Sequence, residues 1–386
     1  MSRQVIAILL DSAPITWTSQ EDRQLKLCES LVERGARPVL VFSEPLSPDF
    51  AARLRATGAE LAAINYGQGF SHYFRELRKL VKEHSITTAH IIFFDYFSAL
   101  PWIAKLAGIP NIIYEMQNSG EFQATSWRRS LLQLRTRLMN SPTTRVIAIS
   151  EFVKEQLIKG GVAGDKIVVR YLGVDTERFV PDASAREQWV QQFNVRADEV
   201  ILSTVSYLRP FKNPQVLVQT CKELATRNMP ARLFVAGDGE MLPGLKELSR
   251  QLEVEDRIHW LGNVPDPRSL LQASDVFVLA SVGEAFGLVL AEAMACGVPI
   301  VGSRSGSLLE VLKDGRTGLL AAPLDPKSFA DAIERLVKDV ELRKKMGRQA
   351  MEEVRQRFTV DIAVETTIDI YESLWREGTN AAAIQA

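Results

Sequence analysis

The stretch that decides the fold is Ser281-Val282-Gly283-Glu284-Ala285-Phe286-Gly287-Leu288-Val289-Leu290-Ala291-Glu292-Ala293-Met294-Ala295-Cys296-Gly297-Val298-Pro299. It follows an apolar run that ends near Ala280, passes through a loop with two glycines, and continues in strong helix formers up to Gly297, with Pro299 behind them. A buried strand, a short loop and a helix, in this order, are typical of a parallel sheet. The stretch therefore predicts a strand, loop and helix unit at the carboxyl edge of such a sheet.

Short runs rich in Val and Ile alternate with longer helical patterns on both sides of this stretch. The expected strands are 5–10, 38–42, 90–94, 111–115, 145–149 and 166–170 in the first half, and 200–205, 232–236, 257–261, 276–279 and 299–302 in the second. Strands that are apolar on both faces indicate parallel sheets covered by helices. The fold class we expect is α/β, with two Rossmann-like doubly wound parallel-sheet domains that face each other across a cleft.

The same pattern predicts the domain boundaries. Residues 1–174 form the N-terminal Rossmann-like domain, and 199–359 form the C-terminal one. Between them, 175–198 are polar, contain Pro181 and are expected to be an interdomain linker. The chain from 326 to 375 is helical in pattern, and 360–378 are expected to form a helix that crosses back to the first domain. Residues 379–386 are expected to be a flexible tail.

Composition excludes several classes of protein. The 386 residues are 46% hydrophobic and 24% charged, which suits two soluble globular domains. With 46 basic and 47 acidic residues the net charge is -1, so no global field recruits nucleic acid or an anionic membrane.

Cys28, Cys221 and Cys296 match neither a disulfide framework nor a metal-ligand spacing, and we expect buried free thiols. The run 5–10 is too short to cross a bilayer, so we expect a buried strand and a cytoplasmic protein.

The helix after Gly287 is suited to bind a diphosphate. Its first amides, from Gly287 through Leu288 to Val289, have no intrahelical acceptor and carry the positive end of the helix dipole. Glu292 lies about one and a half turns further along, where a carboxylate can accept hydrogen bonds from ribose hydroxyls. Its Ala and Met neighbours indicate a buried element rather than a solvated face. Glu284, before the helix, is placed for the hydroxyls of a sugar.

A site for a diphosphate also favours cations, and the segment 206–214 contains Arg209 and Lys212. This segment lies between an expected strand and a helix that begins at Asn213 and Pro214. Both cations are expected to face the cleft. The alternative is that Arg209 and Lys212 simply lie in an exposed basic turn without a ligand.

At these residues the sequence resembles the family 4 glycosyltransferases, whose C-terminal domains carry this Glu-x-Phe-Gly run with a second glutamate eight positions after the first. The resemblance covers nearly all of 200–360, and its further segments are 235–239, 261–264, 273–276, 299–301, Gly306, 310–311 and 314–320. It implies the fold called GT-B. The donor-binding residues that we expect are Gly262, Val264, Phe286, Gly287, Leu288, Val289 and Glu292, with Gly262 and Val264 contacting the base through backbone groups.

The resemblance implies a retaining glycosyltransferase that uses a nucleoside-diphosphate sugar, with a UDP-sugar favoured, and no other cofactor. The acceptor is unidentified, and the product is a glycan, a glycolipid or a small-molecule glycoside. Lys212, Arg209 and the helix amides can meet the leaving-group charge, and no Asp-x-Asp run occurs, so we expect no metal. The catalytic residues that we expect are Glu284, Arg209, Lys212 and Asp95.

This chain departs from the family pattern in several places. The family's arginine lies five residues before the lysine, whereas Arg209 lies three before Lys212. The usual Gly-Gly loop after the first strand is replaced by 11–17, and histidines that many relatives carry are absent from 93–96 and 114–118. Asp95 and Gln117 are our candidates near the transferred sugar, with Asp11 and Asn118 also on the acceptor side. The alternative is that Asp95 and Gln117 only cap strand ends.

Two rival functions stay open at this point. A nucleotide-sugar epimerase or hydrolase on the same fold is one, because the acceptor loop is atypical. A sugar-nucleotide-binding protein that has lost turnover is the other, because the Gly-Gly loop and the histidines are absent.

The segment 127–139 bears on partners. Trp127, Leu131, Leu134 and Leu138 share one helical face, and four arginines lie around the others. One interpretation is a membrane-surface helix, which would place the protein at the inner face of the membrane as a peripheral protein. The other, which we expect, is a core-facing helix with a solvated basic side.

Overall fold

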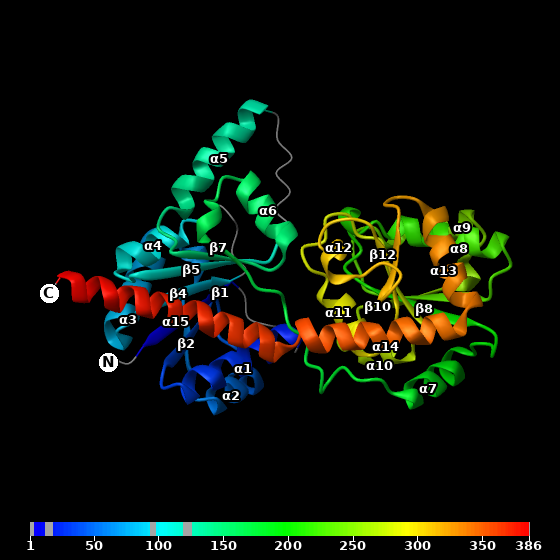
Figure 1. Cartoon of the computed structure of the whole chain (residues 1–386), viewed down its shortest axis with the longest axis horizontal. Coiled ribbons are helices and arrows are strands. Elements are labelled where there is room, and N and C mark those ends of the chain that lie inside the picture. Colours follow the sequence, from blue (N-terminus) through cyan, green and yellow to red (C-terminus); the bar gives the residue numbers. More distant parts are fainter. Residues whose placement is uncertain (1–3, 12–17, 93–97, 119–125, 386) are drawn as a thin grey trace. The chain divides into compact units, whose positions relative to one another are not determined.

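The computed structural model describes residues 4–11, 18–92, 98–118 and 126–385, with side chains throughout these ranges except at 126–129 and 378–385. The chain divides into two compact units (Figure 1), and each is described by itself. Unit 1 comprises Met1–Gly173 and Val360–Ala386, and unit 2 comprises Val174–Thr359.

Unit 1 is built on a parallel sheet in the order β3-β2-β1-β4-β5-β6-β7. The strands are β1 (Val5–Leu10), β2 (Arg37–Phe42), β3 (Glu60–Ala63), β4 (Thr88–Ile92), β5 (Asn111–Met116), β6 (Arg145–Ala148) and β7 (Ile167–Val169). Almost every residue of β1, β2, β4 and β5 is buried, because helices cover both faces.

The helices of unit 1 connect these strands and add one from the end of the chain. They are α1 (Ser19–Glu33), α2 (Pro48–Ala56), α3 (Phe70–His84), α4 (Leu100–Ala107), α5 (Ser126–Asn140), α6 (Glu151–Lys159) and α15 (Val360–Gln385), with the short turns η1 (Tyr66–Gln68) and η2 (Gly164–Lys166). α15 packs against α1, and its Ile368 and Tyr371 share one apolar core with Ile8 of β1 and Leu27 of α1. A segment far away in sequence thus completes the core of the first sheet.

Unit 2 has its own parallel sheet, in the order β10-β9-β8-β11-β12-β13. Its strands are β8 (Val200–Val205), β9 (Ala231–Ala236), β10 (Ile258–Gly262), β11 (Val276–Leu279), β12 (Ile300–Ser303) and β13 (Gly318–Ala321). Taking β8 as the first, this is the strand order 3-2-1-4-5-6 of doubly wound nucleotide-binding folds. The order reverses between β8 and β11, which are neighbours.

The helices of unit 2 cover both faces of this sheet. They are α7 (Ala183–Phe193), α8 (Pro214–Thr226), α9 (Leu242–Gln251), α10 (Arg268–Ala273), α11 (Leu288–Ala295), α12 (Leu308–Val311), α13 (Pro326–Lys338) and α14 (Val340–Arg357), with η3 (Pro210–Lys212) and η4 (Glu255–Arg257). α8, α9 and α13 share the larger apolar core, whereas Trp189 and Phe193 of α7 pack with Leu270 of α10 and Phe234 of β9 in a smaller one.

The predicted α/β class and two parallel sheets are confirmed, and the strands expected from the sequence are present. Two strands were missed, β3 and β13, each of four residues. Residues 175–198 include α7 and count with unit 2, and α15 continues to Gln385 through the segment that we expected to be a flexible tail. Cys28, Cys221 and Cys296 are free and buried, as predicted.

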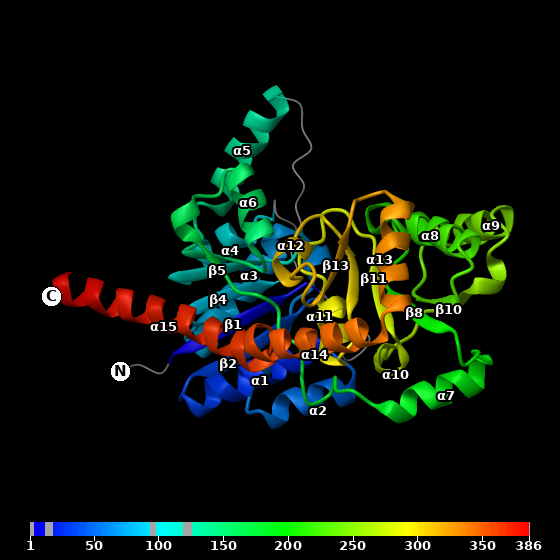
Figure 2. The same ribbon diagram turned by 45° about the vertical axis from the view of Figure 1, so that its right-hand side comes forward.

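The expectation for the segment 127–139 is wrong in one respect. In α5, Leu131, Leu134 and Leu138 are 63%, 54% and 53% exposed, so the apolar face that we expected to face the core faces outward. The side toward the unit carries Thr136 and Asn140, both buried. Figures 1 and 2 show α5 extending away from the sheet of its unit. No helix among the described residues has both the length and the apolarity that a membrane crossing requires.

Candidate active site

Two loops meet at the carboxyl edge of the unit 2 sheet. The loop 206–213 follows β8, and the loop 280–287 follows β11. These strands are directly paired, with Val276 opposite Leu202. Since the strand order reverses between β8 and β11, the two loops lie at the point where doubly wound sheets bind ligands.

Lys212 and Glu284 form an ion pair between these loops. Nζ of Lys212 donates a hydrogen bond of 2.6 Å to Oε2 of Glu284, and the two side chains are only 17% and 11% exposed. The backbones are joined as well, because the N–H of Val282 donates to the C=O of Phe211 at 2.9 Å. A lysine has three donor protons, so two remain for another acceptor. Both residues were site candidates, and the structure brings them together.

Helix α11 begins beside this ion pair. Gly287 precedes the helix with φ of 80° and ψ of 59°, a left-handed conformation that favours glycine. The N–H groups of Leu288 and Val289 open the helix and have no acceptor within it. A Cβ at Gly287 would lie 3.3 Å from Cγ of Glu284, so the Glu284 side chain lies directly against the start of the helix. Free helix amides and the ion pair therefore share one small region.

Two further donor-side candidates lie deeper. Glu292 is 7% exposed, as its Ala and Met neighbours predict, and burial together with the Glu292 carboxylate raises the pKa of Cys296 to about 12. Phe286 is 1% exposed, and its ring packs edge-on against Phe358 with centroids 5.5 Å apart. Only the backbone of Phe286 can therefore contact a ligand.

A third loop, after β12, fixes the position of Glu284. The N–H of Ser307 donates to the C=O of Glu284 at 3.1 Å, and the Ser305 hydroxyl accepts from the N–H of Gly283 at 3.2 Å. Gly306 has φ of 58°, and a Cβ there would lie 2.8 Å from both the N and O atoms of Glu284. Only a glycine fits without displacing Glu284, so Gly306 supports the position of the Glu284 carboxylate.

A pocket of ≈ 600 Å³ lies along the same edge. It is lined by the ends of β8 and β9 and by the segment after β10, namely Val205, Ser206, Tyr207, Ala236, Gly237, Asp238, Gly239, Glu240, Asn263 and Val264. Val264 was predicted as a base contact and lines the pocket. Gly262, also predicted, lies at its border, where its C=O accepts from the N–H of Gly237 at 2.7 Å.

Several pocket residues were not assigned a role from the sequence. Gly237 and Gly239 lie so close to the loop after β8 that a Cβ would approach the carbonyl oxygens of Ser206 and Leu208 to 1.9 and 2.5 Å. The signal was present, since two glycines one residue apart directly after a strand indicate close backbone packing. The sequence showed the motif but not that it forms a pocket wall with Tyr207.

Arg209 lies on the exposed side of its loop. Its guanidinium is 4.4 Å from the centroid of the Tyr207 ring, a cation–π contact, and both residues are exposed. Because Tyr207 lines the pocket, this contact places the Arg209 guanidinium beside a residue of the pocket wall. Lys212 pairs with Glu284 and Arg209 with Tyr207, so the two cations have different partners.

In unit 1 the acceptor-side candidates follow different strands. Asp11 follows β1 and is exposed, although the loss of water on its protein-facing side raises the pKa of its carboxyl group. Gln117 and Asn118 follow β5, and Asn118 is exposed. Asp95, our fourth catalytic candidate, lies outside the described residues, as do 12–17 of the atypical loop.

Gln117 joins a buried charged cluster. Its Nε2 donates to Glu115 and its Oε1 accepts from Gln20, so both ends of the amide are engaged. Glu115 also forms ion pairs with Arg23 and Arg170, and all three are about 1% exposed. Burial alone would raise the pKa of Glu115, but Arg170 and Arg23 hold it well below its usual range. Gln117 is therefore part of the support beneath the edge of the sheet.

The fold and the motifs agree with known proteins. The model for "Glycosyl transferases group 1" matches residues 185–353, and the model for "Glycosyltransferase Family 4" matches 22–178. This chain belongs to glycosyltransferase family 4. In this family 4 protein the first match covers every strand of unit 2, and the second covers β2 to β7 of unit 1 but not β1.

Solved structures show the same fold for this family 4 protein. A glycosyltransferase from Rickettsia africae superposes with a TM-score of 0.81 at 19% identity, covering 97% of this chain and 99% of the other. Anabaena HepE in complex with UDP-glucose gives 0.80 at 20% identity, covering 96% and 100%. The expected GT-B fold is confirmed.

Two curated relatives are similar in sequence to this family 4 protein. N-acetyl-alpha-D-glucosaminyl L-malate synthase of Bacillus anthracis is 37% identical over 193 residues, which are 50% of each chain. D-inositol 3-phosphate glycosyltransferase of Kribbella flavida is 33% identical, over 55% of this chain and 52% of the relative. The chain thus matches about half the length of these relatives.

Proposed function

We propose that this protein is a retaining, metal-independent glycosyltransferase that transfers a sugar from a UDP-sugar to an acceptor bound by unit 1. The observation that carries the proposal is the Lys212–Glu284 ion pair beside the open amides of α11. This pair lies at the reversal of strand order in unit 2. The complex of HepE with UDP-glucose, a protein of the same fold, supports the choice of donor.

The donor is proposed to lie along the carboxyl edge of unit 2. Its base enters the pocket at Val264, and its diphosphate meets the amides of Leu288 and Val289. Glu292 takes the ribose hydroxyls, and Glu284 takes hydroxyls of the sugar. Lys212 stays paired with Glu284 and offers its remaining protons to the diphosphate, whose negative charge grows as the glycosidic bond breaks.

The anomeric configuration is retained if the acceptor attacks the anomeric carbon on the same face from which the diphosphate leaves. The acceptor oxygen forms the new bond to the anomeric carbon while the bond to the diphosphate oxygen breaks. The acceptor proton passes to that diphosphate oxygen, so no separate protein base is required. Lys212, Arg209 and the helix amides stabilise the leaving charge in place of a metal ion.

The names of the two relatives suggest trial acceptors. L-malate and D-inositol 3-phosphate are both small hydroxylated anions. We propose that they be tested first, each with UDP-glucose and UDP-N-acetylglucosamine. The product's anomeric configuration, read by NMR, tests retention, and an inverted product contradicts it. Activity that disappears with a chelator and returns with manganese contradicts metal independence.

Variants of the ion pair test the site itself. Replacing Glu284 with alanine should lower kcat by about 10²- to 10³-fold, the usual effect of removing one positioned polar group, with UDP affinity nearly unchanged. Lys212→Ala should lower both kcat and UDP affinity, because the lysine also meets the ground-state diphosphate. Lys345→Ala, at an exposed position of α14, is the matched control and should change neither.

Incubating the protein with a UDP-sugar and no acceptor distinguishes transfer from the rival activities. A transferase should leave a UDP-sugar largely intact until an acceptor is added. Rapid epimerisation or hydrolysis that an acceptor does not change would support the rival enzyme. UDP binding without turnover of any sugar would support a binding protein.

A further inference from the structure

Helices α4 and α5 present an apolar surface to the outside of unit 1. Leu131, Leu134 and Leu138 of α5 are more than half exposed, and on α4 Leu106 is 58% and Trp102 37% exposed. The two helices are in contact here, because Nε1 of Trp102 donates to the C=O of Leu138 at 2.7 Å. We call these five residues the α4/α5 face. Isolated exposed leucines are ordinary, but a cluster on adjacent helices marks a surface that binds something apolar.

All the charged residues of α4 and α5 are positive. Residues 100–107 and 126–140 contain four arginines and one lysine but no aspartate or glutamate, in a chain whose net charge is -1. At 100° per residue, Arg135 and Arg137 lie on opposite flanks of the leucine stripe. Both are exposed. The leucines therefore form a strip with a cation on each side.

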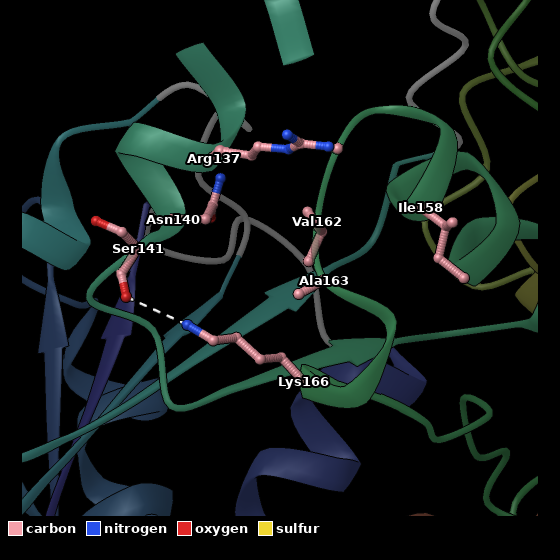
Figure 3. Close-up of a pocket in the computed structure, with 8 residues that line it drawn as sticks. Arg137, Asn140, Ser141, Ile158, Val162, Ala163 and Lys166 are labelled. Carbon is pink, nitrogen blue, oxygen red and sulfur yellow. Dashed lines mark hydrogen bonds between the residues drawn. The ribbon is translucent and has the colours of Figure 1, made fainter. Parts of the chain in front are cut away.

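A second basic feature lies beside Arg137. A pocket of ≈ 460 Å³ is lined by the ends of α5 and α6 and by the segment before β7, with Arg137 and Lys166 as its charged residues. In Figure 3, Arg137 extends from α5 toward the loop that carries Val162. Nζ of Lys166 donates to the carbonyl oxygens of Ser141 and Thr143 at 3.2 and 2.8 Å. No carboxylate lines this pocket among the described residues.

We propose that the α4/α5 face binds the surface of a membrane that contains anionic phospholipids. The leucines and Trp102 enter the boundary between headgroups and acyl chains, while Arg135, Arg137 and Lys105 meet lipid phosphates. A second copy of this chain does not fit the same surface, because two faces with only positive charges repel each other. The pocket at Arg137 gives one phosphate headgroup a site beside the helix.

Co-sedimentation of the full chain with vesicles tests this proposal. The chain should bind vesicles of phosphatidylcholine mixed with phosphatidylglycerol, and bind vesicles of phosphatidylcholine alone much more weakly. The double variants Leu131→Ser with Leu134→Ser, and Arg135→Glu with Arg137→Glu, should each lower the partition coefficient at least about tenfold. These side chains are exposed, so thermal unfolding should stay unchanged.

Matched controls lie on α14 in unit 2. Val340 is 43% exposed and Lys345 is exposed, so Val340→Ser and Lys345→Glu alter an exposed apolar residue and an exposed cation elsewhere. Both should bind the mixed vesicles like the unaltered chain. No binding to phosphatidylglycerol vesicles, or equal loss in the controls, overturns the proposal. A dimer in solution that the leucine variants convert to monomers would also overturn it, because the face would then join two copies. None of these readouts depends on sugar transfer.

Discussion

At the residue scale, the position of Glu284 depends on its neighbours more than on its own sequence context. Lys212 binds the carboxylate, the N–H of Ser307 binds the Glu284 C=O, and the absence of a side chain at Gly306 leaves room for the Glu284 backbone. The sequence identified Lys212 and Glu284 from their motifs. It could not show the support by Gly306, because that contact joins loops after two different strands.

Gly306→Ala should impair transfer without unfolding the protein. The new Cβ would lie 2.8 Å from backbone atoms of Glu284, so the carboxylate must move, and a displacement of this kind can cost about 10²-fold in rate. Gly315→Ala is the matched control, since Gly315 also has positive φ, 75°, but no atom within 4 Å of its added Cβ. Kinetics of both variants check this, and equal losses would show that backbone strain alone is responsible.

The buried cluster of unit 1 gives a residue-scale prediction on pH. Burial lowers the pKa of His90 from its ordinary 6.5, so the folded state keeps it neutral where the unfolded chain takes up a proton. The unfolded state then binds more protons below about pH 6.5, and stability falls as the pH falls.

Urea unfolding of the wild type and His90→Asn at several pH values checks this. The variant should lose less unfolding free energy on acidification, because asparagine does not titrate. Parallel curves for the two proteins would contradict the assignment to His90. Glu115, whose pKa is held low, adds a further loss at more acidic pH in both proteins.

At the element scale, the strands that the sequence missed share a physical cause. β3 reads Glu60-Leu61-Ala62-Ala63 and β13 reads Gly318-Leu319-Leu320-Ala321, with no β-branched residue in either. Both are edge strands of four residues, formed by pairing with a stronger neighbour rather than by propensity. The direction of α5 was missed for another reason, since periodicity shows that a helix has an apolar face but not what it faces.

Helix α15 is tied to the first sheet by one buried polar contact. The Tyr371 hydroxyl lies 2.6 Å from Nδ1 of His90, and both residues are fully buried. Tyr371→Phe leaves that nitrogen without its partner and should cost about 1–3 kcal/mol of unfolding free energy. Tyr207→Phe, at a residue 56% exposed, should cost little. Denaturant titration compares the two, and equal costs would contradict a specific role for this contact.

At the scale of the whole molecule, the two units differ in how the chain builds them. Unit 2 is one continuous segment, Val174–Thr359, whereas unit 1 needs two segments. The two-sheet organisation could be predicted from alternating apolar runs. The sequence also led us to expect that 360–378 return to the first domain, but not which side chains, such as Ile368, Tyr371 and Leu374, enter its core, because an apolar helix face can fit several partners.

The polypeptide 174–359 should therefore fold by itself and bind UDP, because its core and its proposed donor site are complete within it. The polypeptide 1–173 should not reach a stable native state, because its core lacks the apolar face of α15. Circular dichroism melting and calorimetric UDP titration check this. A cooperative transition in 1–173 alone, or failure of 174–359 to fold, would contradict it.

The place of α15 also sets the order in which the halves can mature during translation. The ribosome must pass Leu374 before the first sheet can close its core, and by then all of β8 to β13 has left the exit tunnel. Although domains usually mature from the N-terminal end as they are made, here the later half is finished first. Until then the apolar side chains that α15 covers, such as Ile8 of β1 and Leu27 of α1, stay exposed on the nascent chain.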